Sequence, residues 1–526
     1  MSRLSRWSTL AWSALLFVGV FLPSQSGAVQ QAQQPQQTQP LSTEYATTKT
    51  TPVLHTTTRM VILDVVAVNE KSEPITDLTV DDFTVLEDGK PQKVSDFSFH
   101  RPGSTAAPAR QLAPGVVSNA PQFAAGSCLN VILLDAINTD FSDHAYAQDM
   151  LDKYLDSSPS LQPTAVFALE GKLTMLHDFT TDPKILRDVV AHFKPQGPEH
   201  IADVYTAASP FQRRGSFKAG PHAREVTENA MLFLARSLAS YPGRKNLIWL
   251  SDGFPVSLFP DFNGGDQVMV VEDYSPMAER IADELMNAQV ALYPIHAAGV
   301  SINDTFPAHT AMASMAERTG GKTFFNRNDI DTGVRTSLDD GATYYTLDYY
   351  PQNRIWDRKF RRIEVKLNRP KAQLRYRQGY YALSPTSVDG STREAFSRAM
   401  DRDAPSSAGV LFQAGVVLPS SQTQGKTVVN FGIDPHTLTF EKEADDLQHV
   451  TVSCVVWAFP AKGEPVRGEG ESKAALKADV YQQVMHSYFP CHRDLALKSG
   501  HYTLRLGVLD ETSNLIGTTS MQVNIP

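Results

Sequence analysis

The chain has 526 residues, of which 42% are hydrophobic and 20% charged, so its composition is that of a soluble globular protein and its length predicts several domains. The formal net charge of −9 argues against a general nucleic-acid binder, because neutralising phosphate groups requires clustered Lys and Arg. We therefore expect no basic surface with interleaved aromatic residues and no nucleic-acid partner.

The first residues have the pattern of an export signal. Arg3 and Arg6 precede the apolar run Leu10 to Leu22, and Ser26-Gly27-Ala28 follows with small residues where a signal peptidase cleaves. The run is shorter than the ~20 residues that a membrane-spanning helix needs. We predict a signal peptide over 1–28 and an exported protein, periplasmic or extracellular; an uncleaved membrane anchor is the alternative. We expect no transmembrane segment in the rest of the chain.

The next two segments differ sharply in composition. Residues 29–58 are rich in Gln, Thr and Pro, and such a sequence cannot bury enough apolar surface to fold, which predicts a disordered tether. Residues 59–102 contain three strand-like runs and an Asp88-Gly89 hairpin turn, so we predict a small β-module. Its core would be small, and we expect it to pack on a neighbour. Residues 101–125, with several Pro, Gly and Ala, predict a linker.

Residues 127–383 alternate between strand and helix patterns. Apolar runs predict strands at 131–134, 165–169, 173–177, 246–250, 290–295, 322–325 and 344–349. Amphipathic periodicity predicts helices at 145–155, 182–193, 224–240, 275–288, 308–318 and 330–339. This alternation is typical of an α/β fold with a doubly wound, mostly parallel sheet. Two further strands, 361–367 and 373–377, are expected to extend or flank that sheet.

The C-terminal part has a different pattern. A charged, helix-prone connector at 391–403 leads to 404–526, where short alternating runs separated by turns predict an immunoglobulin-like β-sandwich. Cys454 and Cys491 both fall in this region, and because export implies an oxidising compartment we expect them to pair. Cys128 begins a predicted buried strand, which favours a small core residue over a reactive thiol.

Two predicted buried strands end in acids. The first is followed by Leu134-Asp135-Ala136-Ile137-Asn138-Thr139-Asp140, and the second by Ser251-Asp252-Gly253. Ligands of open α/β sheets bind at the carboxyl ends of the strands, near the switch in strand order. A carboxylate at such a place lies close to the apolar core, so it must be paired, solvated or bound to a metal.

This arrangement resembles a von Willebrand factor A domain. More narrowly, the sequence resembles the von Willebrand factor A-related proteins of the acidobacterial type over 59–382. The stretches that carry the resemblance are Leu78-Thr79-Val80-Asp81-Asp82-Phe83 with Glu87-Asp88-Gly89, Pro242-Gly243-Arg244-Lys245-Asn246-Leu247-Ile248-Trp249, Tyr344 to Pro351, and Gln378-Gly379-Tyr380-Tyr381.

The resemblance implies a metal-ion-dependent adhesion site. In that family an Asp-x-Ser-x-Ser loop, a Thr from a later loop and an Asp after the fourth strand bind a divalent ion. The matching positions here are Asp135, Thr139, Thr227 and Asp252, with Thr206 as a second candidate for the Thr. Hydroxyl and carboxylate oxygens suit a hard ion such as Mg²⁺ or Mn²⁺.

One position departs from the pattern. The first Ser of the motif is replaced by Ile137, which has no side-chain oxygen, and Asn138 and Asp140 do not occupy the matching place. Two interpretations remain open. The site binds a metal ion, or it is degenerate and its two acids cap loops and accept backbone hydrogen bonds.

The resemblance implies an exported, multi-domain protein of the binding or adhesion type. Its partner would be a protein or a cell-envelope component, bound at the strand-end face around Asp135 and Asp252. The alternatives are a metal-dependent hydrolase that uses the same face, and an inert structural scaffold of a secreted assembly. The sequence has neither a Gly-x-Ser-x-Gly nucleophile motif nor a Gly-x-Gly-x-x-Gly motif. We therefore expect no enzyme activity.

Overall fold

The computed structural model describes residues 60–101, 112, 115–120, 127–158, 161–195, 221–239, 241, 243–254, 275–300, 306–382, 390–442 and 445–526. The chain divides into two units, Met1–His55 and Thr56–Pro526, and every described residue belongs to the second. The predicted signal peptide, the predicted tether and Thr206 lie outside the described residues. Within them, no helix combines the length and the hydropathy needed to cross a bilayer.

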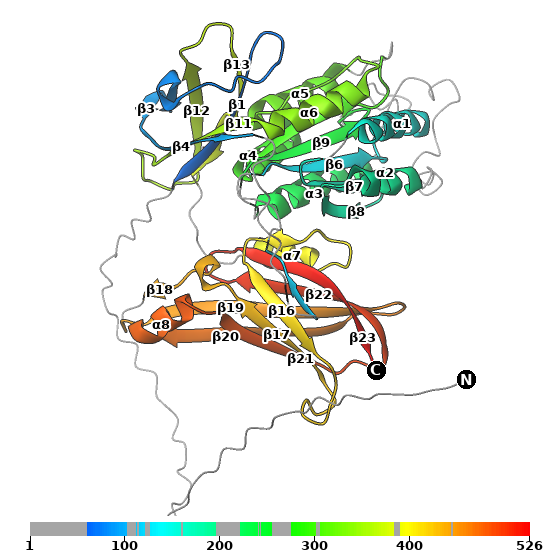
Figure 1. Ribbon diagram of the computed structural model, residues 1–526, viewed down its shortest axis with the longest axis vertical. Helices are drawn as coiled ribbons and strands as arrows, with labels where there is room; N and C mark the ends of the chain where they lie inside the picture. The colour runs from blue at the N-terminus through cyan, green and yellow to red at the C-terminus, as the bar shows by residue number, and fades with distance from the viewer. Residues whose placement is uncertain are drawn as a thin grey trace, which may run out of the picture. The chain divides into compact units, whose positions relative to one another are not determined.

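A five-stranded sheet forms the centre of the α/β part (Figure 1). Its order is β10-β9-β6-β7-β8, with the first four strands parallel and β8 antiparallel at one edge. The bounds are β6 Leu129–Asp135, β7 Thr164–Leu169, β8 Leu173–Thr180, β9 Lys245–Ser251 and β10 Val290–His296. All residues of β6, β7, β9 and β10 are buried, as continuous apolar runs predict for central strands.

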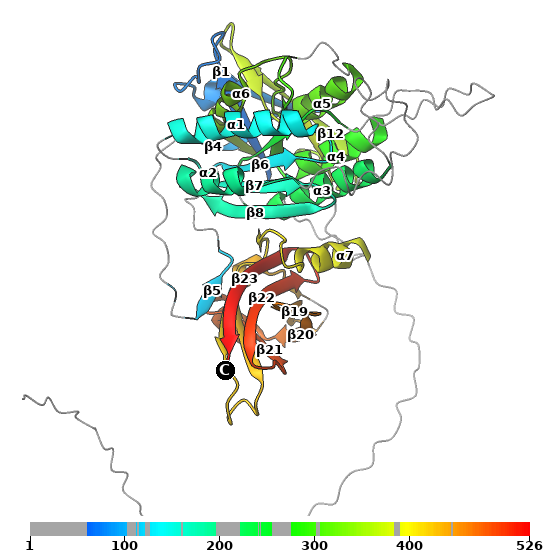
Figure 2. The ribbon, with the colours of Figure 1, turned by 90° about the vertical axis from the view of Figure 1, so that its right-hand side faces the viewer.

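Helices cover both faces of this sheet (Figure 2). One core joins the sheet to α3 (Pro221–Ala239), α4 (Ser275–Asn287) and α5 (Phe306–Thr319). The other core joins it to α1 (Phe141–Ser157), α2 (Pro183–His192) and α6 (Ile330–Ala342). The predicted doubly wound, mostly parallel α/β architecture is confirmed. The predicted strand at 322–325 is wrong, since Phe324 makes only an isolated bridge with Ile295.

The strands before and after this part combine in two further sheets. One has the order β13-β1-β11-β4 and the other β14-β12-β2-β3, and a single hydrophobic core includes residues of both. The bounds are β1 Val61–Val68, β2 Phe83–Glu87, β3 Lys90–Gln92, β4 Val94–His100, β11 Tyr344–Tyr349, β12 Phe360–Leu367, β13 Gln373–Arg375 and β14 Gly379–Tyr381.

This pairing corrects one expectation. Strand β11 was expected in the parallel sheet, but it pairs antiparallel with β1 and β4, and β12 pairs with β2. The residues predicted as an N-terminal β-module therefore complete their sheets with strands much later in the chain, such as Leu63 opposite Leu347, 284 positions away. The small core of residues 59–102 gives the reason, because the partners bury apolar faces that the segment cannot bury alone.

The C-terminal part is built from two β-sheets around one core. The four-stranded sheet has the order β21-β17-β16-β5; the other has β15-β23-β22-β19-β18, with β20 also paired to β19. The bounds are β5 Val116–Ser118, β15 Ser407–Ala408, β16 Phe412–Val417, β17 Thr427–Ile433, β18 Glu441–Lys442, β19 Gln448–Pro460, β20 Val466–Leu476, β21 Phe489–Leu495, β22 Gly500–Asp510 and β23 Ile516–Ile525, with helices α7 Gly390–Ala399 and α8 Ala478–Met485. Strand β5 comes from the segment predicted as a linker.

The cysteines behave as expected. A disulfide joins Cys454 of β19 to Cys491 of β21 and thereby connects the two sheets. Cys128 is a free, buried thiol, and burial raises its pKa to about 12, so it stays protonated and unreactive at neutral pH.

Candidate functional site

The two acids identified from the sequence lie at the switch point of the parallel sheet. The chain runs from β6 outward to β7 on one side, and returns to place β9 on the other side of β6. Asp135 is the last residue of β6 and Ser251 the last of β9, and Leu134 pairs with Leu250 just before them. The carboxyl ends of both strands therefore place their side chains together, as expected for this kind of sheet.

Asp135 is fully buried and accepts four hydrogen bonds. Its Oδ2 accepts from Trp249 Nε1 at 2.9 Å, Ser251 Oγ at 2.8 Å and Asn138 Nδ2 at 2.9 Å, and its Oδ1 accepts from the Asn138 backbone N–H at 3.0 Å. Burial raises the pKa of Asp135, while these four donors oppose the rise by favouring the carboxylate. The side chain therefore pins the loop after β6 to the end of β9.

Asn138 bridges Asp135 to helix α3. Its Nδ2 donates both to Asp135 Oδ2 and, at 2.8 Å, to Thr227 Oγ1. The Thr227 hydroxyl uses its single proton to donate to the carbonyl of Ala223 at 2.7 Å, so toward Asn138 it can only accept. The amide nitrogen thus lies between two acceptors, which fixes the orientation of the side chain. Its Oδ1 is buried and has no hydrogen-bond partner among the described residues.

Thr139 and Asp252 form the outer part of the site. The backbone N–H of Asp252 donates to Thr139 Oγ1 at 3.2 Å, and the backbone N–H of Asp140 donates to Asp252 Oδ2 at 2.9 Å. The other carboxyl oxygen of Asp252, Oδ1, is buried and has no hydrogen-bond partner in the described part of the chain. The four residues predicted as a metal site are therefore gathered in two pairs, Asp135 with Thr227 through Asn138, and Thr139 with Asp252.

The rim around Asp252 is electrostatically unfavourable for anions. The pKa of Asp252 is raised to about 8, mainly by burial and also by the negative charges of Asp143 and Asp140 and a hydrogen bond with the Asp143 carboxyl group, and only the hydrogen bond from the Asp140 backbone opposes this rise. The pKa of Asp140 is also raised, by burial and by Asp143. Among the described residues none of these three carboxyl groups has an ion pair. At neutral pH Asp252 therefore carries a proton for much of the time.

The arrangement does not fit a divalent ion between Asp135 and Thr227. The position between them is filled by an amide N–H group, which is a donor and cannot ligate a cation. Both oxygens of Asp135 already accept hydrogen bonds, and Ile137 is buried in the core on the α3 side of the sheet. No group of three His, Cys, Asp or Glu side chains with a metal-binding arrangement occurs within the described ranges. Metal binding by these residues stays a prediction.

Asn138, Trp249 and Ser251 are site residues that the sequence reasoning did not assign. Ser251 could have been found, because it directly precedes Asp252 at the end of a buried strand. Trp249 stands inside an apolar run, and nothing in the sequence shows that its indole N–H faces an acid on the neighbouring strand. Asn138 stands outside the metal-binding pattern, and nothing in the sequence shows that its amide group donates to Asp135.

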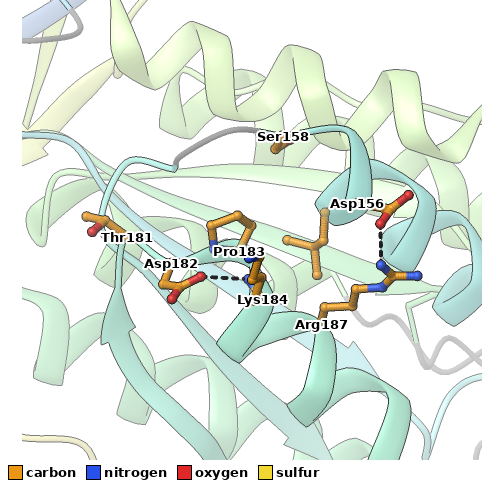
Figure 3. Close-up of a pocket in the computed structure, with 8 residues that line it drawn as sticks. Asp156, Ser158, Thr181, Asp182, Pro183, Lys184 and Arg187 are labelled. Atoms are coloured by element: carbon orange, nitrogen blue, oxygen red, sulfur yellow. Dashed lines mark hydrogen bonds and ion pairs between the residues drawn. The ribbon is translucent and has the colours of Figure 1, made fainter.

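A surface pocket of about 500 Å³ lies elsewhere, between the end of α1 and the start of α2 (Figure 3). Asp182 caps α2 by accepting from the Lys184 backbone N–H at 2.9 Å, and Arg187 pairs with Asp152 and Asp156. Arg187 is thus paired with acids of α1, and the pocket is a surface hollow between the two helices.

No family model and no curated protein matches the chain. Solved structures with some similarity include a von Willebrand factor type A protein from Catenulispora acidiphila, with a TM-score of 0.24 and 9% identity over 82% of this chain and 74% of that one. The von Willebrand factor domain of the type V pili tip protein Mfa5 from Porphyromonas gingivalis has a TM-score of 0.25 and 12% identity. That match covers 42% of this chain and 97% of the other. An aerotolerance-related membrane protein from Bacteroides fragilis has a TM-score of 0.25 and 10% identity, and the match covers 41% of this chain and 99% of that one.

With such low identities and TM-scores, neither a binding site nor a partner of these proteins can be assigned to this chain. The strand order, the antiparallel edge strand and the acids at the switch point are the grounds on which we describe the α/β part as von Willebrand factor A-like. The narrower assignment to the acidobacterial type stays a prediction.

Proposed function

We propose that this chain is an exported, non-enzymatic binding protein whose partner, a protein or a cell-envelope component, docks on the rim around Asp252. The observation that supports the proposal is the burial and incomplete hydrogen bonding of the Asp252 carboxyl group. Its Oδ1 is buried and accepts no hydrogen bond from an N–H group or a hydroxyl of the described residues, and it lies beside two further acids without an ion pair. A buried oxygen without a partner costs free energy, and a docking group that donates to it recovers that cost.

The chemistry of the rim indicates what the partner presents. The carboxyl groups of Asp140 and Asp143 favour a cationic donor, such as a Lys or Arg side chain, over a carboxylate, and a docked cation lowers the pKa of Asp252 and so favours its charged form. Phe141, which directly follows Asp140, is 66% exposed and offers an apolar contact beside the acids. A guanidinium or ammonium group from the partner would supply directly the positive charge that a divalent ion supplies in an adhesion site of the metal-dependent kind.

This proposal differs from a metal-mediated one in its response to chelators. Wild type, Asp252→Asn and the surface control Asp479→Asn would be used to capture partners from a cell-envelope extract, with and without a chelator. We expect the same partner with and without chelator, its loss in Asp252→Asn and its retention in Asp479→Asn. Loss of the partner on chelation of the wild type would instead support an ion as the bridging group, and equal capture by all three proteins would contradict the proposed face.

Two weaker alternatives give separate outcomes. A hydrolase would turn over a generic ester or phosphate ester and lose that activity in Asp252→Asn. An inert scaffold would capture nothing specifically at the rim. For the hydrolase, the hydroxyl next to Asp135 is that of Ser251, which is fully buried and therefore does not face a substrate.

A further inference from the structure

One short segment is strongly basic, although the chain as a whole is acidic. Residues 354–362 read Arg-Ile-Trp-Asp-Arg-Lys-Phe-Arg-Arg, with five basic residues and one acid, whereas the formal net charge of the chain is −9. This is a basic stretch with interleaved aromatic residues, which the sequence reasoning had not expected. It follows β11 and leads into β12.

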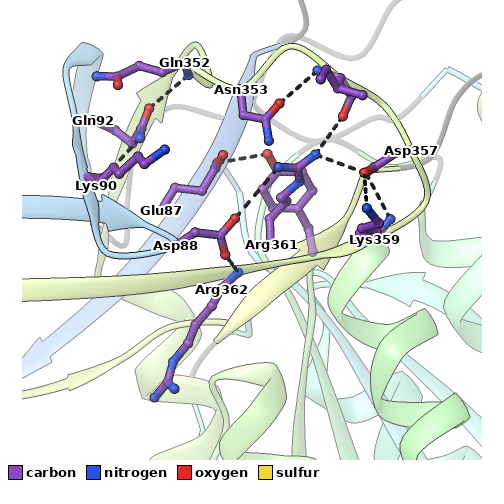
Figure 4. A network of polar contacts seen from close by, with 12 residues as sticks. Glu87, Asp88, Lys90, Gln92, Gln352, Asn353, Asp357, Lys359, Arg361 and Arg362 are labelled. Carbon is purple, nitrogen blue, oxygen red and sulfur yellow. Dashed lines mark hydrogen bonds and ion pairs between the residues drawn. The ribbon is translucent and has the colours of Figure 1, made fainter.

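The loop is held in one conformation by buried polar contacts (Figure 4). The side chain of Arg361, only 7% exposed, donates to the carbonyl of Ile355 at 2.7 Å and to Asp357 Oδ1 at 3.1 Å. The backbone N–H of Ile355 donates to Asn353 Oδ1 at 3.1 Å. Both backbone polar groups of Ile355 are therefore used within the loop, and its position does not depend on its side chain.

The apolar side chains of this region are unusually exposed. Ile355 is 67% exposed, the most of any large hydrophobic residue among those described, and Tyr350 and Phe360 are 47% and 37% exposed. Met60, at 42%, directly precedes Val61, which pairs with Tyr349, so Met60 and Tyr350 lie at the same end of adjoining strands. Phe360 and Arg361 face opposite sides of β12, and Arg361 contacts the backbone of Ile355, so Ile355 is the exposed apolar side chain of the loop itself.

Three basic side chains of the loop have no acidic partner among the described residues. Arg354, Arg358 and Arg362 are exposed and form no ion pair there, whereas Lys359 pairs with Asp357 at 3.2 Å. In Figure 4 the side chain of Arg362 extends away from the polar network. Arg358 has a positive φ of 62°, which a non-glycine residue adopts at a cost, and its N–H donates to the carbonyl of Ala382 at 2.8 Å. The loop thus presents free cations beside exposed apolar groups.

We propose that this loop, in which the exposed Ile355 stands between the unpaired Arg354 and Arg358, binds an anionic lipid membrane. Apolar side chains enter the boundary between headgroups and acyl chains, while the arginines contact phosphate groups. The charge of the loop supports this occupant, because its five basic residues and one acid complement the negative phosphate groups of an anionic membrane. The proposal goes beyond the partner face around Asp252 and does not depend on it.

A nucleic acid is the other polyanion that basic residues could bind, and the side chains favour the membrane. Stacking on bases requires free aromatic faces, but the ring of Trp356 packs on Tyr380 with 6.2 Å between centroids, and that of Phe360 on Tyr381 with 5.3 Å. The most exposed apolar group is the aliphatic Ile355, which cannot stack on bases but can enter a lipid layer.

The test is binding to vesicles of phosphatidylcholine alone and of phosphatidylcholine mixed with phosphatidylglycerol, at low and high salt. Each protein is recovered after export and its N-terminal residue is determined, so that all variants carry the same N-terminal segment. The variants are Arg354→Glu/Arg358→Glu and Ile355→Asp. Their matched controls are Lys462→Glu/Lys498→Glu, which reverses two exposed charges elsewhere, and Leu515→Asp, which replaces another exposed apolar residue.

We expect wild type to bind the mixed vesicles more tightly than phosphatidylcholine, with the difference reduced by salt. Each arginine contributes about fivefold to partitioning, so the double charge reversal lowers binding by tenfold or more. Ile355→Asp lowers binding to the mixed vesicles about fivefold at high salt and more at low salt, because it removes an apolar contact and adds a negative charge that salt screens. Both controls and Asp252→Asn bind as wild type.

Two outcomes overturn the proposal. Equal binding of all proteins to both kinds of vesicle shows that this surface takes no part. Binding of a DNA or RNA oligonucleotide that depends on the arginines, without vesicle binding, assigns the surface to nucleic acid. Circular dichroism and the unfolding midpoint establish that each variant is folded, and retained partner capture by the arginine variants separates this surface from the Asp252 rim.

Discussion

The amide nitrogen of Asn138 donates to Thr227 Oγ1 at 2.8 Å and so ties the loop after β6 to helix α3. The same nitrogen donates to Asp135, which makes the Asn138 amide the link between two residues that the von Willebrand factor A resemblance assigns to a cation. A neutral donor holds the two acceptors together without any ion. The inner part of the site is then permanently assembled, and only its outer part around Asp252 is left for a partner.

The first prediction concerns this link. Asn138→Ala removes both side-chain hydrogen bonds and leaves Asp135 and Thr227, both buried, with one donor fewer each. We expect the free energy of unfolding to fall by about 2 kcal/mol, since unsatisfied buried acceptors cost about 1–3 kcal/mol. The measurement is the denaturant midpoint. Asn430→Ala, at an exposed position of β17, is the control and should change it by less than about 0.5 kcal/mol. Equal effects of the two substitutions would show that the bridge contributes nothing.

The second prediction concerns the metal ion. We expect Mg²⁺ and Mn²⁺ to produce neither binding heat nor a rise in the unfolding midpoint of the wild type, because an N–H group lies where the ion would bind and Ile137 offers no oxygen. The double variant Ile137→Ser/Asn138→Ser removes the amide and restores a hydroxyl at the motif position. It should gain Mn²⁺ binding and a higher midpoint in the presence of the ion. Calorimetric titration decides between these results, and saturable Mn²⁺ binding by the wild type that Asp252→Asn abolishes would restore the metal-dependent interpretation.

The sequence predicted the central α/β part because its strands are continuous apolar runs whose ends carry polar residues. The runs ending at Asp135 and Ser251 are long enough to identify as buried strands, and the rule for switch points then places the acids at one edge. The convergence of Asp135 and Asp252 could therefore be predicted without knowledge of any contact.

The strand pairing of Tyr344–Tyr349 could not be predicted in the same way. An apolar run of six residues fits a parallel sheet and an antiparallel one equally well, and only the register with Val61–Val68 decides between them. The role of Asn138 depends on a loop conformation in which its backbone N–H also reaches Asp135. The basic surface near Ile355 was missed because the net charge of the whole chain conceals a local excess of opposite sign.

The third prediction concerns the disulfide. Cys454 and Cys491 are 37 positions apart, and their bond links the two sheets of the C-terminal part. The double variant Cys454→Ser/Cys491→Ser should lower the free energy of unfolding by about 3 kcal/mol, mainly because the unfolded chain regains the freedom of the open loop. Reducing agent should lower the unfolding midpoint of the wild type and leave that of the variant unchanged. A wild type that is insensitive to reduction under unfolding conditions would show that the bond does not form in the exported protein.

The fourth prediction uses the pH dependence of stability to test the state of Asp252. Its pKa is raised to about 8 in the folded chain, against an ordinary value of 3.8. Between these values the folded chain retains a proton that the unfolded chain has released, so this residue makes the free energy of unfolding decrease as the pH rises from about 4 to about 8. Asp252→Asn removes the titrating group while keeping an oxygen that can accept from Asp140.

The variant should therefore match the wild type in stability near pH 4 and exceed it by about 2 kcal/mol near pH 8, a difference that allows for solvent screening at the rim. Urea unfolding across this pH range measures the difference, and all other titrating groups largely cancel between the two proteins. Asp479→Asn, at an exposed position, should follow the wild type throughout. If the stability of Asp252→Asn relative to the wild type were the same at both ends of the range, the pKa of Asp252 would not be raised on folding and its carboxyl group would be ionised at neutral pH.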